Sequence, residues 1–202
     1  MRVLIIRHGE SEADLLDVHE GRADFELTEL GREQAERMAI WVKDNYKIDR
    51  IYASTLKRAK QTAIALSQEV GIPIEETEYL MEFNNGLIAG LSRKEAAQKY
   101  PEDLSLPIHE SVYEMESLLE FRFRGDYILS KILSENNPDA TVAIVSHGGM
   151  INQLYRSFLR LPVDSNIIFP TSDTGIHSWS FENNRRVILF ANSTKHLIKM
   201  IC

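Results

Sequence analysis

The chain has 202 residues, 44% of them hydrophobic and 8% aromatic, which is enough to bury one sizeable core and predicts a single domain over 1–202. Its formal net charge of -7, with no run rich in Lys or Arg, argues against binding to nucleic acid or to an anionic membrane surface. The only cysteine, Cys202, leaves no partner for an intrachain disulfide and cannot supply a cysteine zinc site, so we expect a cytoplasmic protein.

The first predicted element is a strand over the apolar run Val3-Leu4-Ile5-Ile6, whose length and β-branched residues are typical of a buried strand. The run is too short for the core of a signal peptide. No stretch of the sequence approaches the roughly 20 apolar residues of a spanning helix, so no membrane association is expected.

The next segments alternate between helical and strand patterns. Thr28 is placed to cap a helix, because apolar residues at helical spacing follow it, and a short strand at 51–53 comes next. Ser54 and the threonine after it can cap a second helix, which Gly71 is expected to end. A strand over 74–80 should follow.

The middle of the sequence is predicted to be helical. Ser92 and Ser111 each stand three residues before a glutamate, the spacing of a capping box, and this predicts helices over about 92–135. Prolines interrupt the region, and Asn136-Asn137-Pro138 closes it. We expect a small inserted helical cap over about 83–138.

A second apolar run, Val142-Ala143-Ile144-Val145, predicts another strand and leads into Ser146-His147-Gly148. A helix from 149 to about 159 should follow, and then a hairpin over 176–191 that turns at Glu182-Asn183-Asn184. Strands separated by helices in this rhythm predict an α/β fold, namely a three-layer α/β/α sandwich with a mainly parallel central sheet.

Both apolar runs end in a His-Gly pair. Ligands bind beyond the carboxyl ends of strands in an open α/β sheet, so His8 and His147 are expected to share one crevice. An imidazole can act as a nucleophile, a general acid or a metal ligand, and the pair alone leaves these roles open.

Five segments, taken together and in order, narrow the possible roles of the two histidines. They are Arg7-His8-Gly9-Glu10-Ser11, 27–31 (LTELG), 53–62 (ASTLKRAKQT), 80–82 (LME) and 145–149 (VSHGG). They resemble the ordered motifs of the histidine phosphatase superfamily, the phosphoglycerate-mutase-like enzymes, and span most of the chain. The resemblance implies a three-layer α/β/α fold and a phosphohistidine intermediate on His8. It also implies a phosphate pocket that includes Arg7, Arg58 and His147, with Glu82 as the proton donor.

The residue types suit phosphoryl transfer without a metal or another cofactor. Positive groups must surround the transferred phosphoryl, and the planar guanidinium groups of Arg7 and Arg58 can bind its oxygens. Nearby cations should also lower the pKa of His8 and keep one ring nitrogen free to attack. Glu82 can protonate the leaving alkoxide and, once ionised, activate the water that hydrolyses phospho-His8.

Further candidates for substrate binding lie close to these motifs: Ser11, Asp14, Gly21, Arg22, Gly148 and His177. Asp14 stands where many family members have asparagine, which replaces an amide donor by an acceptor when the carboxyl is ionised. Ala89 stands where phosphatase members often carry a glutamate, which leaves Glu82 as the acid candidate of that segment.

The predicted function is therefore a metal-independent phosphomonoesterase that acts on a small phosphorylated metabolite. A cofactor-dependent phosphoglycerate-type mutase is an alternative, although such mutases are typically longer. A catalytically silent phosphate-binding module is another. A metallohydrolase with His8, Glu82 and His147 as ligands is disfavoured, because two arginines beside a cation repel it and metal-ligand spacing is lacking. The chain is expected to be a monomer, or a homodimer paired through an exposed strand edge.

Overall fold

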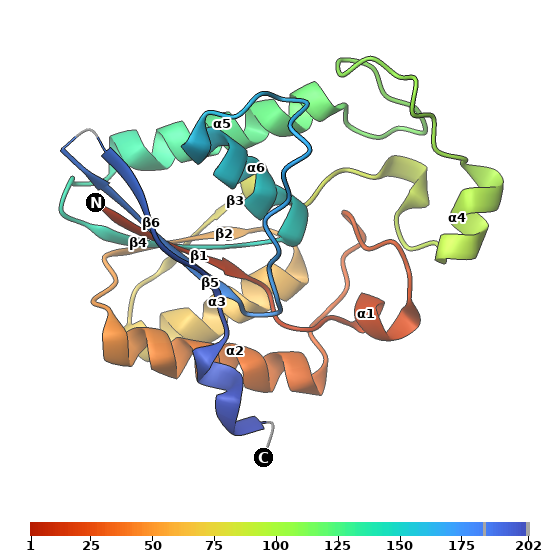
Figure 1. The fold of residues 1–202 in the computed structure, drawn as a ribbon. Coiled ribbons are helices and arrows are strands. Elements are labelled where there is room, and N and C mark those ends of the chain that lie inside the picture. Colours follow the sequence, from red (N-terminus) through yellow and green to blue (C-terminus); the bar gives the residue numbers. More distant parts are fainter. Residues whose placement is uncertain (184, 201–202) are drawn as a thin grey trace.

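A computed structural model describes residues 1–183 and 185–200, and in these ranges the strands form one sheet of six in the order β3-β2-β4-β1-β5-β6 (Figure 1). Four strands run parallel, namely β1 (Arg2–Arg7), β2 (Arg50–Ser54), β3 (Ile74–Thr77) and β4 (Thr141–Ser146). β5 (Ile176–Glu182) and β6 (Arg185–Ser193) are antiparallel to their neighbours. The expected mainly parallel sheet is confirmed.

Helices cover both faces of this sheet (Figure 1). Leu4 and Ile6 of β1 pack in the core beneath α2 (Glu29–Asn45) and α3 (Lys57–Val70). Val3 and Ile5 point to the other face, into the core that α5 (Leu118–Glu135) and α6 (Gly148–Leu159) close. Successive side chains of a strand alternate between faces, so a strand buried on both needs the unbroken apolar run seen here.

The helices before and after β2, α2 and α3, differ in how their first residues are capped. Thr28 caps α2 as predicted, because its Oγ1 accepts from the Gly31 N–H at 2.9 Å. The next helix, α3, starts later than expected, at Lys57 after the N-cap Leu56, and the Ser54 hydroxyl accepts from the Leu56 N–H at 3.3 Å and bonds to His147 Nε2. Gly71, in the left-handed region at φ 72°, ends α3 as expected.

The strand expected over 74–80 is shorter in the structure. β3 ends at Thr77, and a 3-10 turn, η1 (Glu78–Leu80), replaces its last three residues. Thr77 Oγ1 accepts from the Tyr79 N–H at 3.3 Å, which favours the turn over further strand pairing.

The two α-helices of the region 83–138 differ in their position relative to the sheet. The short α4 (Arg93–Lys99) stands away from the sheet, whereas α5 is a layer helix that buries Phe121, Ile128 and Ile132 in the core (Figure 1). The capping box expected at Ser111 starts no helix, since Tyr113 and Glu114 adopt left-handed turns at φ 57° and 61°. The box that starts α5 is Ser117 with Glu120.

Two short elements, α1 (Glu12–Leu16) and η2 (Gly86–Ile88), lie in the loops after β1 and η1. The predicted terminal hairpin is present, with longer strands than expected, and Asn184 of its predicted turn lies outside the described residues. The turn η3 (Lys195–Met200) follows it. In residues 1–183 and 185–200, no helix has the length and apolar character needed to cross a membrane.

Candidate active site

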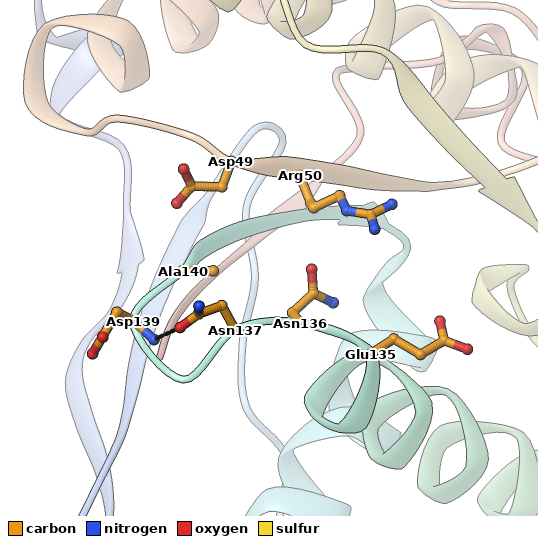
Figure 2. A pocket seen from close by; sticks show the side chains of 7 residues that line it. All are labelled: Asp49, Arg50, Glu135, Asn136, Asn137, Asp139 and Ala140. Carbon is orange, nitrogen blue, oxygen red and sulfur yellow. Dashed lines mark hydrogen bonds between the residues drawn. The ribbon is translucent and has the colours of Figure 1, made fainter.

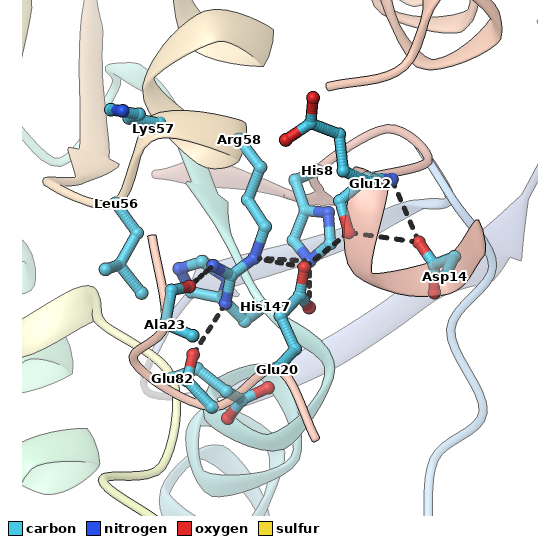
Figure 3. Close-up of polar contacts among 12 residues, drawn as sticks. His8, Glu12, Asp14, Glu20, Ala23, Leu56, Lys57, Arg58, Glu82 and His147 are labelled. Atoms are coloured by element: carbon cyan, nitrogen blue, oxygen red, sulfur yellow. Dashed lines mark hydrogen bonds and ion pairs between the residues drawn. The ribbon is translucent and has the colours of Figure 1, made fainter. Parts of the chain in front are cut away.

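The site lies at the carboxyl ends of β1, β4 and β2, which are adjacent in the sheet. His8 follows β1, His147 follows β4, and their ring centroids are 5.1 Å apart with the planes inclined by 56° (Figure 3). Both imidazoles are buried. The expectation that the two His-Gly pairs meet in one place is confirmed.

His8 is held with one ring nitrogen free for chemistry. Its Nδ1 lies 2.7 Å from the Gly9 carbonyl oxygen, which can only accept, so Nδ1 carries the proton. Nε2 is therefore the unprotonated nitrogen, and it accepts from Arg58 Nε at 3.3 Å. Burial, followed by the charges of Arg58 and Arg7, lowers the pKa of His8 well below its ordinary value. The ring is a neutral imidazole whose Nε2 lone pair is available.

Arg58 is fully buried, and its guanidinium is fixed from three sides (Figure 3). Its Nη2 donates to the Gly21 carbonyl at 2.8 Å and its Nη1 donates to the Ala23 carbonyl at 3.0 Å. The third nitrogen, Nε, faces His8. Gly21 itself is needed for backbone reasons, because it has φ 47° and a Cβ there would overlap the Asn85 side chain.

Arg7 reaches the same end of the sheet from β1 and is only partly buried. Its Nη1 donates to the Thr171 carbonyl at 3.0 Å and lies 3.3 Å from Asp173 Oδ1. Thr171 and Asp173 lie on the loop before β5 and have no sequence signal that links them to the motifs. They hold the Arg7 guanidinium in place.

His177 is not at the rim of the pocket. It is buried on β5, where its Nδ1 shares a 2.8 Å hydrogen bond with the Tyr155 hydroxyl and its Nε2 shares one of 3.0 Å with Thr171 Oγ1. Burial lowers the pKa of His177 to about 4, so the ring is neutral. The structure therefore places it behind the loop that holds Arg7, with both ring nitrogens bonded to protein groups, and not at the expected pocket rim.

His147 has one satisfied and one free nitrogen. Its Nε2 shares a 2.8 Å hydrogen bond with Ser54 Oγ, whereas its buried Nδ1 has no partner in the part of the chain that the structure describes. Burial, with Arg58 and His8 next, lowers the pKa of His147 well below its ordinary value. The sequence did not reveal the role of Ser54, although this residue ends a strand adjacent to β4.

Glu82 is fixed by backbone donors after η1. Its Oε1 accepts from the Phe83 N–H at 2.7 Å and its Oε2 accepts from the Gly149 N–H at 2.8 Å. Arg124 of α5 donates to the Glu82 carbonyl at 3.0 Å and forms a two-point ion pair with Glu116, at 2.8 and 2.5 Å. This pair, which sequence reasoning missed, fastens the loop that carries Glu82.

Asp14 and Ser11 lie on the loop that returns from β1. The exposed Asp14 accepts from Ser11 N–H at 2.9 Å and from Ser11 Oγ at 3.2 Å, so it closes the capping box of α1. The Ser11 hydroxyl also lies 2.5 Å from Glu20 Oε1, so its single hydrogen is shared between the two carboxyl groups, with the shorter contact to Glu20. The structure therefore brings Ser11 to the site, and Ser11 lies between Asp14 and the site residue Glu20.

Glu20 is a further site residue that sequence reasoning missed. Its Oε1 is 3.0 Å from Arg58 Nε, and its Oε2 is 3.7 Å from the free Nε2 of His8 (Figure 3). The only signal for it in the sequence was its position directly before Gly21-Arg22.

The remaining candidates lie at the edge of the site. Arg22, with about a third of its side chain exposed, donates from Nε to the Glu82 carbonyl at 3.5 Å and lies 3.8 Å from Glu116 Oε1. Gly148 begins α6 beside His147, and a Cβ there would meet only Thr171 Cγ2, at 3.8 Å. The Gly148 position therefore leaves open space beside His147.

A separate polar pocket of about 400 Å³ lies at the other end of the sheet, where β2 and β4 begin (Figure 2). Its lining residues are Asp49, Arg50, Glu135, Asn136, Asn137, Asp139 and Ala140. None of the predicted site residues belongs to it. Across residues 1–183 and 185–200, no group of three or more His, Cys, Asp or Glu is arranged to hold a metal ion.

Comparison with known proteins identifies the family. Residues 3–194 match the model of the histidine phosphatase superfamily (branch 1), so the chain belongs to that superfamily. It is 27% identical over 201 residues to phosphoserine phosphatase 1 of Hydrogenobacter thermophilus, with 98% of this chain and 94% of the relative covered. It is 35% identical over 159 residues to a 2,3-bisphosphoglycerate-dependent phosphoglycerate mutase of Cytophaga hutchinsonii, with 75% and 74% covered.

A solved structure agrees with these relatives. Phosphoserine phosphatase of Entamoeba histolytica, in complex with 3-phosphoglyceric acid, superposes with a TM-score of 0.80 at 27% identity, covering 98% of this chain and 99% of that one. The relatives confirm the expected class of enzyme, a histidine-type phosphatase or phosphoglycerate-mutase-like phosphoryl transferase.

Proposed function

We propose that the chain is a metal-independent phosphomonoesterase that hydrolyses a small phosphorylated metabolite through a phosphohistidine on His8. One observation carries the proposal: a buried, neutral His8 presents its unprotonated Nε2 to the space beside Arg58 and His147. The relatives named as phosphatases support the reaction class, and those named for phosphoserine support a small substrate.

In the first step, His8 Nε2 attacks phosphorus, the Nε2–P bond forms and the P–O bond to the leaving group breaks. Arg7, Arg58 and His147 stabilise the charge on the phosphoryl oxygens, and these preorganised groups supply much of the rate. Glu82, in its protonated form, gives its proton to the leaving oxygen. The products of this step are the free alcohol and phospho-His8.

In the second step, water attacks phosphorus and the Nε2–P bond breaks. Glu82, now ionised, takes the proton of the water, and His8 regains its lone pair as inorganic phosphate leaves. The hydrogen bonds of Glu82 to two backbone N–H groups fix the carboxyl for both transfers.

Gly149→Ala should displace Glu82, because a Cβ at Gly149 would overlap Glu82 Oε1. Hydrolysis of an alkyl phosphate is expected to fall by about tenfold or more, as for a partly misplaced general acid. Stability is measured alongside, because the same overlap breaks the hydrogen bond from the Gly149 N–H to Glu82. Steady-state kinetics with thermal unfolding tests this, with Ser157→Ala, two turns further along α6, as the matched control. Wild-type activity in Gly149→Ala would contradict the assigned position of Glu82.

Orthovanadate should inhibit the enzyme competitively, and a chelator such as EDTA should not. Vanadate adopts the trigonal-bipyramidal geometry of in-line transfer, so the cationic groups around His8 should bind it more tightly than a substrate. Initial rates at several vanadate concentrations, with and without EDTA, check this. Loss of activity in EDTA that a divalent metal restores would establish the metallohydrolase instead.

The mutase relative supports one second candidate, a cofactor-dependent phosphoglycerate-type mutase. Both reactions form phosphohistidine and differ in whether water or a retained phosphorylated intermediate receives the phosphoryl. A panel of phosphomonoesters that includes phosphoserine and 3-phosphoglycerate should be assayed for released phosphate and for isomerised product in the same reactions. Released phosphate without isomerisation supports the phosphatase, and isomerised product as the main outcome establishes the mutase.

We further propose a cytoplasmic enzyme that is a monomer or a homodimer. The single cysteine in 202 residues supports a reducing compartment. Exposed apolar side chains on the edge strand β6, among them Val187, Ile188 and Leu189, offer a surface for pairing two copies. Light scattering at several protein concentrations distinguishes the two states.

A further inference from the structure

The carboxylate of Glu20 occupies the space that the proposed reaction assigns to a phosphate oxygen. It is 3.7 Å from the nucleophilic Nε2 of His8, 3.0 Å from Arg58 Nε, and 2.5 Å from the Ser11 hydroxyl that donates to it. A phosphate group poised for attack by His8 would accept from the same two donors, Arg58 and the Ser11 hydroxyl. Glu20 therefore mimics the anion that the site is built to bind.

An ionised Glu20 and a bound dianion cannot share these donors without strong repulsion, because the site is largely closed to water. Only 19% of the Glu20 side chain is exposed. A protonated Glu20 has no such conflict, since its O–H can donate to the anion as Ser11 and Arg58 do. The substitution that best imitates this protonated form is glutamine.

We propose that Glu20 is a further substrate-binding residue, and that the enzyme takes up a proton, shared between Glu20 and the bound anion, whenever a phosphate-like dianion enters the site. Equivalently, the site selects the monoanionic form of a phosphate monoester. This inference rests on the proposed function only in placing the phosphoryl beside His8.

The groups that face Glu20 set the direction of its titration. They are Arg58 from α3, Arg7 and His8 at the end of β1, and Asp14 and Ser11 on the loop that returns from β1. Burial raises the pKa of Glu20, with Asp14 in the same direction, whereas Arg58, Ser11 and Arg7 oppose this rise. A bound dianion adds negative charge beside the carboxyl and raises its pKa further.

Because a bound dianion raises the pKa of Glu20, the affinity for the dianion should depend on pH. Below the pKa of Glu20 in the free enzyme the carboxyl is already protonated, and the affinity for a dianion is at its maximum. As the pH rises from that pKa toward the higher pKa of the complex, the association constant should fall by about tenfold per pH unit. Above both values the dianion binds weakly and without proton uptake.

Sulfate is the probe, because it remains a dianion from pH 5 to 9 and is not hydrolysed. Calorimetry at several pH values, each in two buffers of different ionisation enthalpy, gives both the affinity and the number of protons taken up. Three proteins are compared: wild type, Glu20→Gln and Glu36→Gln. Glu36 is exposed on α2, so this control removes the same charge away from the site.

Wild type and Glu36→Gln are expected to take up a proton with sulfate, and their affinities should fall with pH. Glu20→Gln should take up fewer protons with sulfate than the wild type, and it should bind sulfate about tenfold or more tightly at pH 8. Its affinity should fall less steeply with pH, because the carboxyl whose protonation gives the tenfold change per pH unit is absent. His8 and His147 are present in all three proteins, so a proton that binds to one of these rings can still be taken up by Glu20→Gln.

Equal proton uptake in wild type and Glu20→Gln would assign the proton to a histidine and overturn the proposal. Sulfate binding to the wild type without proton uptake at any pH would overturn it too, because Glu20 then swings aside as a carboxylate. That measurement needs no variant, so it stands even if Glu20→Gln does not fold. Failure of the proposed function shows separately, as absence of phosphomonoester turnover and of phosphohistidine.

Discussion

The variant His8→Ala should lose turnover of every phosphomonoester by about 10³-fold or more, the scale on which removal of a nucleophile is felt when other groups still bind the transition state. The unprotonated Nε2 of His8 lies beside Arg58 and His147 and is the proposed nucleophile. The rates of p-nitrophenyl phosphate and alkyl phosphate hydrolysis measure the loss, and acid-labile phosphate trapped on the protein should vanish with it.

His109→Ala is the matched control, because His109 is an exposed histidine in the loop before α5. It should keep wild-type rates, and both variants should keep the wild-type circular dichroism spectrum. Residual activity of His8→Ala near that of the wild type would rule out the phosphohistidine mechanism. A wild type that binds vanadate but never turns over would instead indicate the silent phosphate-binding module.

The second large effect is expected for Glu82→Gln, and it should depend on the leaving group. An alkoxide is a poor leaving group and needs a proton, so an alkyl phosphate should react about 10² to 10⁴-fold more slowly. The p-nitrophenolate anion departs with little help, so its ester should lose much less. The glutamine can still accept from one of the two backbone N–H groups that fix Glu82, which keeps the loop in place.

The ratio of the two rates, measured for the same preparation of each protein, is the test. Because a general loss of folded enzyme lowers both rates together, only a change in the ratio reports the role of the acid. An unchanged ratio would mean that Glu82 is not the leaving-group acid, and Glu20 would become the candidate, since Asp14 caps α1 instead of facing His8.

The part of the site that was predictable from the sequence is the part carried by strand ends. His8 and His147 each follow a short apolar run, and the carboxyl-end rule for parallel sheets brings them together without further information. Adjacent cations were expected to lower the pKa of His8, and they do, but burial is the larger cause. Burial depends on how loops close over a site, which local patterns do not reveal.

The parts that were missed depend on long-range loop geometry. Glu20 enters the site because the loop between α1 and α2 folds back until Arg58 of α3 binds its backbone at Gly21 and Ala23. His177 leaves the site because β5 pairs directly with β1, which puts residue 177 opposite Ile5 and inside the protein. Likewise α5 looked like part of a cap, since amphipathic periodicity does not tell which partner a helix covers.

The parallel register of β1 and β4 pairs Arg7 with Ser146, so the histidines that follow start from the same level of the sheet. Their 5.1 Å ring separation is close to the roughly 4.8 Å between hydrogen-bonded strands. The spacing of the two rings thus follows from the backbone ladder, whereas the irregular segment 100–117 lies outside it. Such a division lets loops outside the ladder change in length or sequence while the two rings keep their distance.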